Sequence, residues 1–277
     1  MIEDEHKLVA RMAPLLQKVL IVDPSPASAR LLADLMRNVS SGQTWIAPDN
    51  RRGLATAELA GPQLIFVELS GPNVNGLDFA KQLRRSEHSC RKAPIVMVTA
   101  TATAAAILAA RDAGVHEFLR KPFTLKDLLR RLEAVTLRRR DWVEAVDYIG
   151  PDRRRFNSGD YSGKLKRQSD AAVTPNAARI TQALKILKSA LKAVESDPRQ
   201  ALRSMEAQIV DLREAGKALA NLPLISAVAA FQTYLTGAVT QGPLVATEVA
   251  AKAAPVLVFL PNENPKPTAS GLVAVAL

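Results

Sequence analysis

Short apolar runs alternate with amphipathic stretches through the first half of the chain. The runs are apolar at consecutive positions, which is typical of strands buried on both faces of a parallel sheet. They are KVLIVD (18–23), TWIA (44–47), LIFVEL (64–69), PIVMVTA (94–100) and a run within HEFLRKPF (116–123). Each is followed by apolar residues at helical spacing, such as Leu31, Leu32 and Leu35 after the first. This pattern predicts an α/β fold in which helices cover both faces of a five-stranded parallel sheet.

The second half of the chain has a helical pattern. Two successive helices carry apolar residues every three or four positions, which gives each a seam of the heptad kind. The first seam holds Ile180, Leu184, Leu187, Leu191 and Val194, and the second holds Leu202, Met205, Ile209, Leu212 and Leu219. Two further apolar helices follow within 224–239 and 244–254. We predict a mainly α-helical second domain, a hairpin extended into a bundle that packs within one chain or forms a homo-oligomer.

These patterns divide the chain of 277 residues into five parts. We predict an N-terminal extension (1–16), an α/β domain (17–140), a basic linker (141–173), a helical module (174–260) and a flexible tail (261–277). The linker is rich in glycine, serine and charge, with little periodicity, and the tail is rich in proline and asparagine.

Polar residues stand where the predicted strands of the α/β domain end. Asp23 follows the first strand, Glu68 lies in the third, Thr99 ends the fourth, and Lys121 follows the fifth. The carboxyl ends of parallel strands form the edge at which such sheets bind ligands. Two carboxylates, a hydroxyl and an ammonium group at one edge suit the chemistry of a phosphoryl group.

The motifs around these residues resemble the receiver domain of response regulators, from Lys18 to about Arg140. The resemblance is carried by VLIVD, by LIFVEL followed by Gly76-Leu77, by IVMVTA, and by Lys121-Pro122-Phe123, in this order. It implies a (βα)5 fold and a role in two-component phosphorelay signalling. It also implies that Glu68 stands at the phosphoacceptor position, where the family has Asp, and that Phe118 stands at the switch aromatic, more often Tyr.

The sequence departs from the receiver pattern at two positions that matter for phosphorylation. Glu68 is one methylene longer than Asp, and in-line transfer tolerates little misplacement, since about 1 Å can cost roughly a hundredfold in rate. Pro24 follows Asp23 where the family has a second acid that helps to hold Mg²⁺. We therefore expect a pseudo-receiver that is not phosphorylated, in which Glu68 pairs with Lys121 and partly imitates the activated state. A decayed site kept for folding and a conventional phosphorylated regulator remain alternatives.

The net charge of +10 and a short repeat in the linker point to a second kind of site. YIGPDRR (148–154) aligns with YSGKLKR (161–167), each a Tyr-x-Gly followed by basic residues. The candidate anion-binding residues are Tyr148, Arg153, Arg154, Arg155, Tyr161, Lys164, Lys166 and Arg167. Arginine forks bind phosphate and tyrosine rings can stack on bases, so a cyclic dinucleotide, a nucleic acid or an acidic protein face would fit. A solvated linker that binds nothing is the alternative.

Other features of the sequence limit what the protein does. We find no nucleophile–base pair, metal-ligand cluster or Gly-rich phosphate loop, so we expect neither an enzyme nor a resident metal or cofactor. His88 and His116 are expected at the surface or in loops. A single cysteine, Cys90, and a start without a secretory pattern fit the cytoplasm. The uncharged stretch 218–247 is interrupted by residues such as Pro223, so we expect no membrane span.

Overall fold

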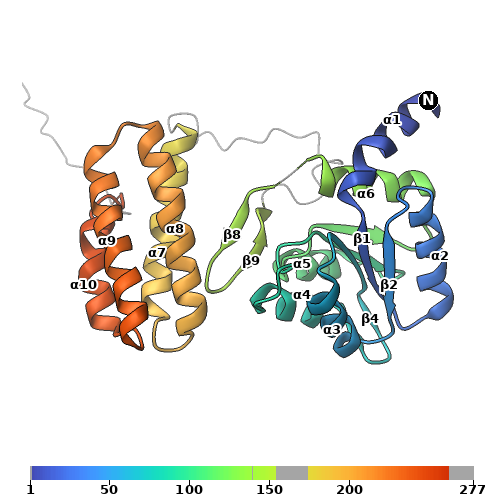
Figure 1. The fold of residues 1–277 in the computed structure, drawn as a ribbon, viewed down its shortest axis with the longest axis horizontal. Helices are drawn as coiled ribbons and strands as arrows, with labels where there is room; N and C mark the ends of the chain where they lie inside the picture. Colours follow the sequence, from blue (N-terminus) through green and yellow to red (C-terminus); the bar gives the residue numbers. More distant parts are fainter. Residues whose placement is uncertain (1, 139, 154–173, 262–277) are drawn as a thin grey trace, which may run out of the picture. The chain divides into compact units, whose positions relative to one another are not determined.

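The computed structural model describes residues 2–138, 140–153 and 174–261, and the chain forms two compact units, Met1–Leu165 and Lys166–Leu277 (Figure 1). The first unit is built on a parallel sheet of five strands in the order β2–β1–β3–β6–β7. These strands are β1 Lys18–Val22, β2 Gln43–Ala47, β3 Leu64–Glu68, β6 Ile95–Thr99 and β7 Glu117–Arg120. The predicted α/β fold class and its five strands are therefore confirmed.

Five helices connect and cover the strands of this sheet. They are α2 Pro26–Arg37, α3 Asn50–Ala60, α4 Gly76–Arg85, α5 Ala104–Asp112 and α6 Leu125–Thr136. Each begins after a short polar residue whose side chain accepts a hydrogen bond from a main-chain N–H of the first turn, which is the standard way to start a helix. The capping residues are Ser25, Asp49, Asn75, Thr103 and Thr124.

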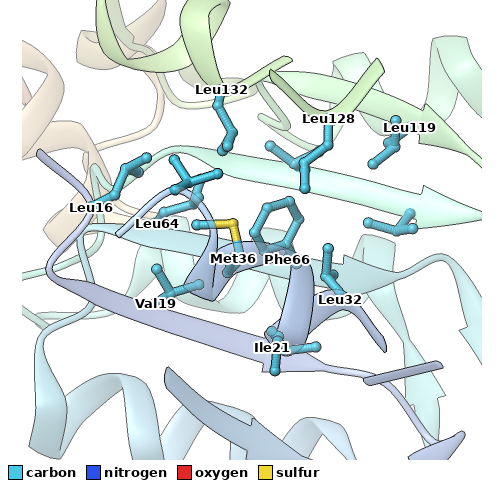
Figure 2. Packing of buried hydrophobic residues seen from close by; sticks show 14 of the residues in the cluster. Leu16, Val19, Ile21, Leu32, Met36, Leu64, Phe66, Leu119, Leu128 and Leu132 are labelled. Carbon is cyan, nitrogen blue, oxygen red and sulfur yellow. The ribbon is translucent and has the colours of Figure 1, made fainter. Parts of the chain in front are cut away.

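Successive strand residues point into two separate apolar cores. Val19 and Ile21 of β1 belong to the core beneath α2 and α6, which Figure 2 shows together with Phe66. Leu20 and Val22 belong to the opposite core, beneath α3, α4 and α5. Both faces of the sheet are thus buried, which explains why its strands are apolar at consecutive positions.

The N-terminal extension contributes to the first of these cores. It forms helix α1, Ile2–Met12, and a short 3-10 turn, Ala13–Leu15. Met12 and Leu16 are fully buried in the core beneath α2 and α6, and α1 contacts α6. The extension is therefore part of the folded domain.

Two short antiparallel hairpins complete the first unit. One follows β3 and consists of β4 Ser70–Gly71 and β5 Val74–Asn75; the other consists of β8 Trp142–Glu144 and β9 Ile149–Pro151. The second lies within the predicted linker, so the absence of regular structure expected there is wrong for residues 142–151. The reason is packing: β9 contacts α4, and Gly150 lies so close to Gly114 that a Cβ atom at 150 would be 2.6 Å from the Gly114 Cα.

The second unit is a bundle of four helices. They are α7 Pro175–Lys192, α8 Pro198–Ala218, α9 Leu222–Gln241 and α10 Ala246–Leu257. Helix α7 packs against α8, α8 against α9, and α9 against α10. Helix α10 also packs against α7, which closes the bundle. Most predicted seam residues are buried, including Leu184, Leu187 and Leu212. Leu219 is 41% exposed, contrary to prediction, because α8 ends at Ala218.

Helix α9 coincides with most of the uncharged stretch. Its length and composition alone would allow it to cross a membrane, which is weak evidence because core helices of soluble proteins also meet that test. One side of α9 packs within the bundle through Leu224, Val228, Phe231 and Leu235.

Candidate functional site

Three of the four strand-end residues meet at the carboxyl edge of the sheet. The Lys121 Nζ lies 2.6 Å from Glu68 Oε2 and 2.9 Å from Asp23 Oδ2. The expected pair between Glu68 and Lys121 is therefore present, and Asp23 extends it to a triad. The side chains of the two acids are almost completely buried, whereas that of Lys121 remains 23% exposed.

The free oxygens of both carboxylates are also engaged. Glu68 Oε1 accepts a hydrogen bond from the Leu69 N–H at 3.0 Å, and Asp23 Oδ1 accepts one from the Ser25 N–H at 2.8 Å. Burial by itself would lower the pKa of Lys121, but hydrogen bonds and charges from Glu68 and Asp23 outweigh it and hold the pKa above its ordinary value. The triad is thus a satisfied network with one excess negative charge.

The sheet itself positions this triad. Glu68 is the last residue of β3 and lies beside Val98 of β6. Lys121 follows β7, and its N–H donates to the Thr99 carbonyl at 2.8 Å. The Asp23 N–H continues the β1–β2 pairing by donating to the Ala47 carbonyl. The side chains converge because the parallel strands end at one edge.

Thr99 and Phe118 occupy less open positions. Thr99 is buried, and its Oγ1 accepts a hydrogen bond from the Thr101 N–H at 3.2 Å, so the hydroxyl supports the turn after β6. Phe118 is buried in the core beneath α3, α4 and α5. Thr99 thus lies at the carboxyl end of β6, and Phe118 lies in the core. The functional roles of both residues remain predictions.

The surroundings of Asp23 do not fit a Mg²⁺ ion, which the receiver resemblance would imply. Pro24 packs against the loop after β3, where a Cβ atom at Gly71 would lie 2.6 Å from the Pro24 Cγ. That loop is also held by Asn50, whose side-chain amide donates to the Asn75 carbonyl at 2.9 Å. Within the described parts of the chain, no three acidic, histidine or cysteine side chains group as metal ligands. Both nearby carboxylates are instead bonded to Lys121.

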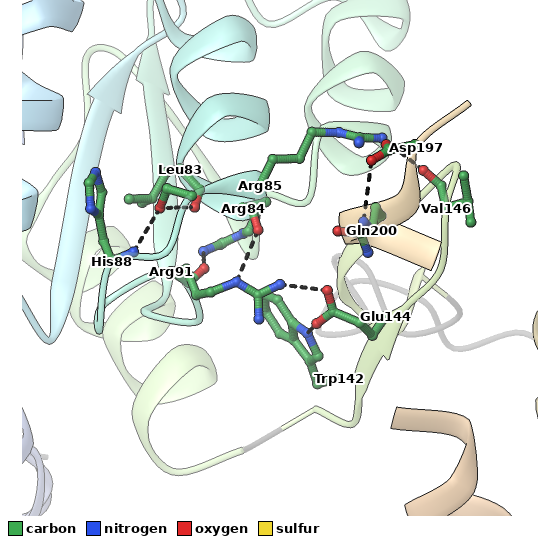
Figure 3. A network of polar contacts seen from close by, with 11 residues as sticks. Leu83, Arg84, Arg85, His88, Arg91, Trp142, Glu144, Val146, Asp197 and Gln200 are labelled. Atoms are coloured by element: carbon green, nitrogen blue, oxygen red, sulfur yellow. Dashed lines mark hydrogen bonds and ion pairs between the residues drawn. The ribbon is translucent and has the colours of Figure 1, made fainter. Parts of the chain in front are cut away.

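A second polar cluster lies at the amino end of the same sheet, and the sequence analysis did not predict it. Its centre is Arg84, which lies in the last turn of α4 and is 1% exposed (Figure 3). The guanidinium donates to the carbonyls of Gly114 at 2.9 Å, Arg91 at 2.6 Å and Ala93 at 2.9 Å. Burial lowers the pKa of Arg84 to about 9.

The hairpin β8–β9 is fastened to this cluster by polar side chains. Glu144 pairs with Arg91 at 2.5 Å and accepts the Trp142 indole N–H at 2.9 Å (Figure 3). Arg85 donates to the Val146 carbonyl at 2.7 Å. The signal for this hairpin was present in the sequence, because apolar and aromatic residues on either side of Asp147 are typical of two short strands.

His116 lies in the loop before β7, one of its two expected kinds of position, but it is buried and not at the surface. Its N–H donates to the Ile95 carbonyl next to β7, and its Nδ1 accepts a hydrogen bond from the Ile95 N–H at 3.3 Å. Burial, with the nearby charges of Arg84 and Arg140, lowers the pKa of His116 well below its usual value. The imidazole is therefore neutral at pH 7.

Two of the predicted anion-binding residues fall within the described chain, and they contact each other. The Tyr148 hydroxyl donates to the Pro151 carbonyl at 2.5 Å, and the ring is buried. The Arg153 guanidinium lies 4.2 Å from the centre of that ring and pairs with Asp112 at 3.1 Å. The other candidates, Arg154, Arg155, Tyr161, Lys164, Lys166 and Arg167, lie outside the described residues. Anion binding there stays a prediction.

Comparison with known proteins assigns the first unit to a family. The family model described as response regulator receiver domain matches residues 19–133. The chemotaxis protein CheY-3 of Vibrio cholerae is 29% identical over 43% of this chain and 90% of its own length. The transcriptional regulatory protein PdtaR of Mycobacterium tuberculosis is 31% identical over 45% of this chain and 59% of its own.

Other matches cover the same half of the chain. The DNA-binding response regulator MtrA of Mycolicibacterium smegmatis is 28% identical over 48% of this chain. This chain spans 57% of the length of MtrA, less than two thirds. The crystal structure of the chemotaxis protein CheY4 of Vibrio cholerae aligns with 43% of this chain, at 27% identity and a TM-score of 0.41.

Proposed function

We propose that this chain, whose residues 19–133 belong to the response regulator receiver family, is a cytoplasmic two-component signalling protein whose receiver works without phosphorylation. The observation that carries the proposal is the 2.6 Å bond between Glu68 and Lys121. It joins the residue at the phosphoacceptor position to the lysine that would otherwise bind the phosphoryl oxygens. The receiver would then exist in one state, set by the sequence.

The chemistry of the triad supports this proposal. A phosphoacceptor must present an oxygen in line with the donor, at about 3–3.5 Å. Both Glu68 oxygens are already hydrogen-bonded, one to Lys121 and one to the Leu69 N–H. Pro24 removes one acid from the site, and the remaining Asp23 is held by Lys121 and Ser25. Phosphorylation would have to break this network without a fitting Mg²⁺ site to offset the cost.

A receiver of this kind would act through protein contacts. The face formed by α5, β7 and α6 carries exposed Leu108 and Leu125, which are 49% and 38% exposed. Lys121 leads directly from the triad into the loop before α6. We propose that this face binds a signalling protein, that the helical bundle serves association with a partner or a second copy, and that the protein is not an enzyme.

Phosphotransfer to the purified chain tests the proposal. Incubation with acetyl phosphate and MgCl₂ should leave the intact mass unchanged, while a control receiver with Asp at the phosphoacceptor position should gain a phosphoryl group in parallel. The matched variant is Glu68→Ala, which should behave like the wild type. A phosphoryl adduct on the wild type that disappears in Glu68→Ala would show that the receiver is a phosphorylated switch.

Binding of an anionic ligand at the basic segment remains the second candidate. It is favoured by the net charge of +10 and by the repeat that contains Tyr148 and Tyr161. Cyclic di-GMP should then raise the melting temperature of the wild type but not that of a variant with Arg153→Ala and Arg154→Ala. An equal shift in both proteins, or none in either, would remove this candidate.

A further inference from the structure

The first unit contains a cavity at the end of the sheet opposite to Glu68. Its volume is about 620 Å³, and its lining includes Gln63, Pro94 and His116, which precede β3, β6 and β7. Further walls come from the turn before β1, the loop between α4 and β6, the end of α6 and the hairpin strand β8, which supplies Trp142. Ligand pockets in proteins typically measure about 300–1,000 Å³ and are mostly apolar, with a few polar groups that orient the ligand.

The charged side chains at this cavity are all cationic. Among the described residues, the lining includes Lys92, Arg138 and Arg140, and no aspartate or glutamate. Arg138 and Arg140 pair with acids that lie outside the lining. Lys92 is exposed and makes no ion pair with any described residue, and its ammonium lies 5.8 Å from the centre of the Trp142 ring. The field inside the cavity therefore favours an anion.

Neutral groups of the lining add a hydrogen-bond donor and apolar surface. The Nδ1 of His116 accepts main-chain and Arg84 hydrogen bonds, so the proton of the neutral ring is on Nε2. Leu15, Pro62 and Val135 line the cavity together with the indole of Trp142. Cys90 also lines it, but its thiol donates to the Ala57 carbonyl and burial raises its pKa, so it is no nucleophile.

We infer that this cavity binds a small molecule that carries an anionic group on a planar apolar body. The cationic side chains at the cavity would hold the anionic group, while Trp142 and the aliphatic lining would contact the apolar body. Several of these walls, among them Leu15, Arg138 and Trp142, lie outside the stretch 19–133 that matches the receiver family. The inference does not depend on whether Glu68 is phosphorylated.

Three probes separate the contributions of charge and ring. 2-Naphthoate has both, 2-naphthylmethanol has the ring without the charge, and acetate has the charge without the ring. Binding is followed by calorimetry and by the fluorescence of Trp142 in a Trp45→Phe background, which leaves one tryptophan. We expect 2-naphthoate to bind more tightly than 2-naphthylmethanol, to perturb Trp142 emission, and to bind more weakly at high salt. Acetate should not bind measurably.

Matched charge variants locate the binding. Lys92→Gln with Arg138→Gln should weaken 2-naphthoate roughly fivefold, as expected for two partly exposed charge contacts, and leave 2-naphthylmethanol unchanged. Lys188→Gln with Lys192→Gln removes the same charge from α7, in the other unit, and should change neither affinity. Equal affinity for the two ring compounds, equal effects of the two variant pairs, or no binding of either ring compound would overturn the inference.

Discussion

The two ends of the central sheet hold a cation in opposite ways. At the carboxyl end, Lys121 is neutralised by Asp23 and Glu68 and remains partly exposed. At the amino end, Arg84 is completely buried, and it donates to three main-chain carbonyls and to the Nδ1 of His116. The pKa of Lys121 is raised by its acids, whereas that of Arg84 is lowered to about 9 by burial. Carboxylates neutralise the charge of Lys121, whereas the dipoles of main-chain carbonyls stabilise that of Arg84.

This difference indicates which end of the sheet tolerates the loss of an interacting side chain. At the carboxyl end, Lys121 remains 23% exposed, so water can reach its ammonium when a partner is lost. At the amino end, three carbonyls from two loops depend on one guanidinium, and Arg84 itself is 1% exposed. We therefore expect the amino end to dominate stability and the carboxyl end to dominate signalling.

The largest expected effect is at Arg84. Arg84→Met should lower the free energy of unfolding by about 3 kcal/mol, because the carbonyls of Gly114, Arg91 and Ala93 lose their hydrogen-bond donor and the Gly114 carbonyl is buried. Arg85→Met, which removes an exposed neighbour on the same helix, should cost less than about 1 kcal/mol. Urea unfolding measures both. A similar loss in the two variants would mean that the buried arginine is not what holds this end together.

A smaller effect is expected at the opposite end. Lys121→Met should cost about 1–2 kcal/mol at pH 7, because it leaves the carboxylates of Asp23 and Glu68 side by side. The raised pKa of Lys121 gives stability that is full below its ordinary value of 10.5 and is lost as the pH rises through the folded pKa. The variant should lack this alkaline loss. Lys126→Met, on the exposed side of α6, is the control and should retain it.

The smallest expected effect is a loss of folding stability at acidic pH, which arises from His116 at the amino end of the sheet. The folded pKa of His116 lies well below 6.5, so below that pH the unfolded chain binds a proton that the folded chain does not. Stability is therefore lost as the pH falls, by up to about 1.4 kcal/mol per pH unit from this group. His116→Asn should remove this part of the slope between pH 6.5 and 5.5, whereas His88→Asn should not. Parallel curves for wild type and His116→Asn would refute the assignment.

The site at the carboxyl end of the sheet could be predicted from the sequence, whereas the Arg84 cluster at the amino end could not. Asp23, Glu68 and Lys121 follow apolar runs, and parallel strands bring their ends together by a general rule. Arg84 ends an amphipathic helix in an ordinary Arg-Arg pair, a pattern that normally indicates a solvated helix end. Its burial depends on carbonyls at Arg91, Ala93 and Gly114, whose proximity follows from tertiary structure alone.

The same reason explains the other differences. His116 was expected at the surface or in a loop, and its burial was missed because a lone histidine without a polar cluster carries no periodic signal. Residues 142–151 were expected to be part of a linker because their charge and glycine content obscured two short strands. Both features are set by contacts with residues far away in the sequence, such as Ile95 and Gly114.

Helix α1 has a consequence for the order in which the domain assembles. Met12 and Leu16 share a core with Leu128 and Leu132, which are synthesised more than 100 residues later. Contacts between residues so far apart in the sequence form slowly. The apolar side of α1 therefore stays uncovered until α6 has folded against it. During synthesis that helix is a surface that a chaperone could bind, and a fragment that begins at Lys18 would expose the leucines of α6.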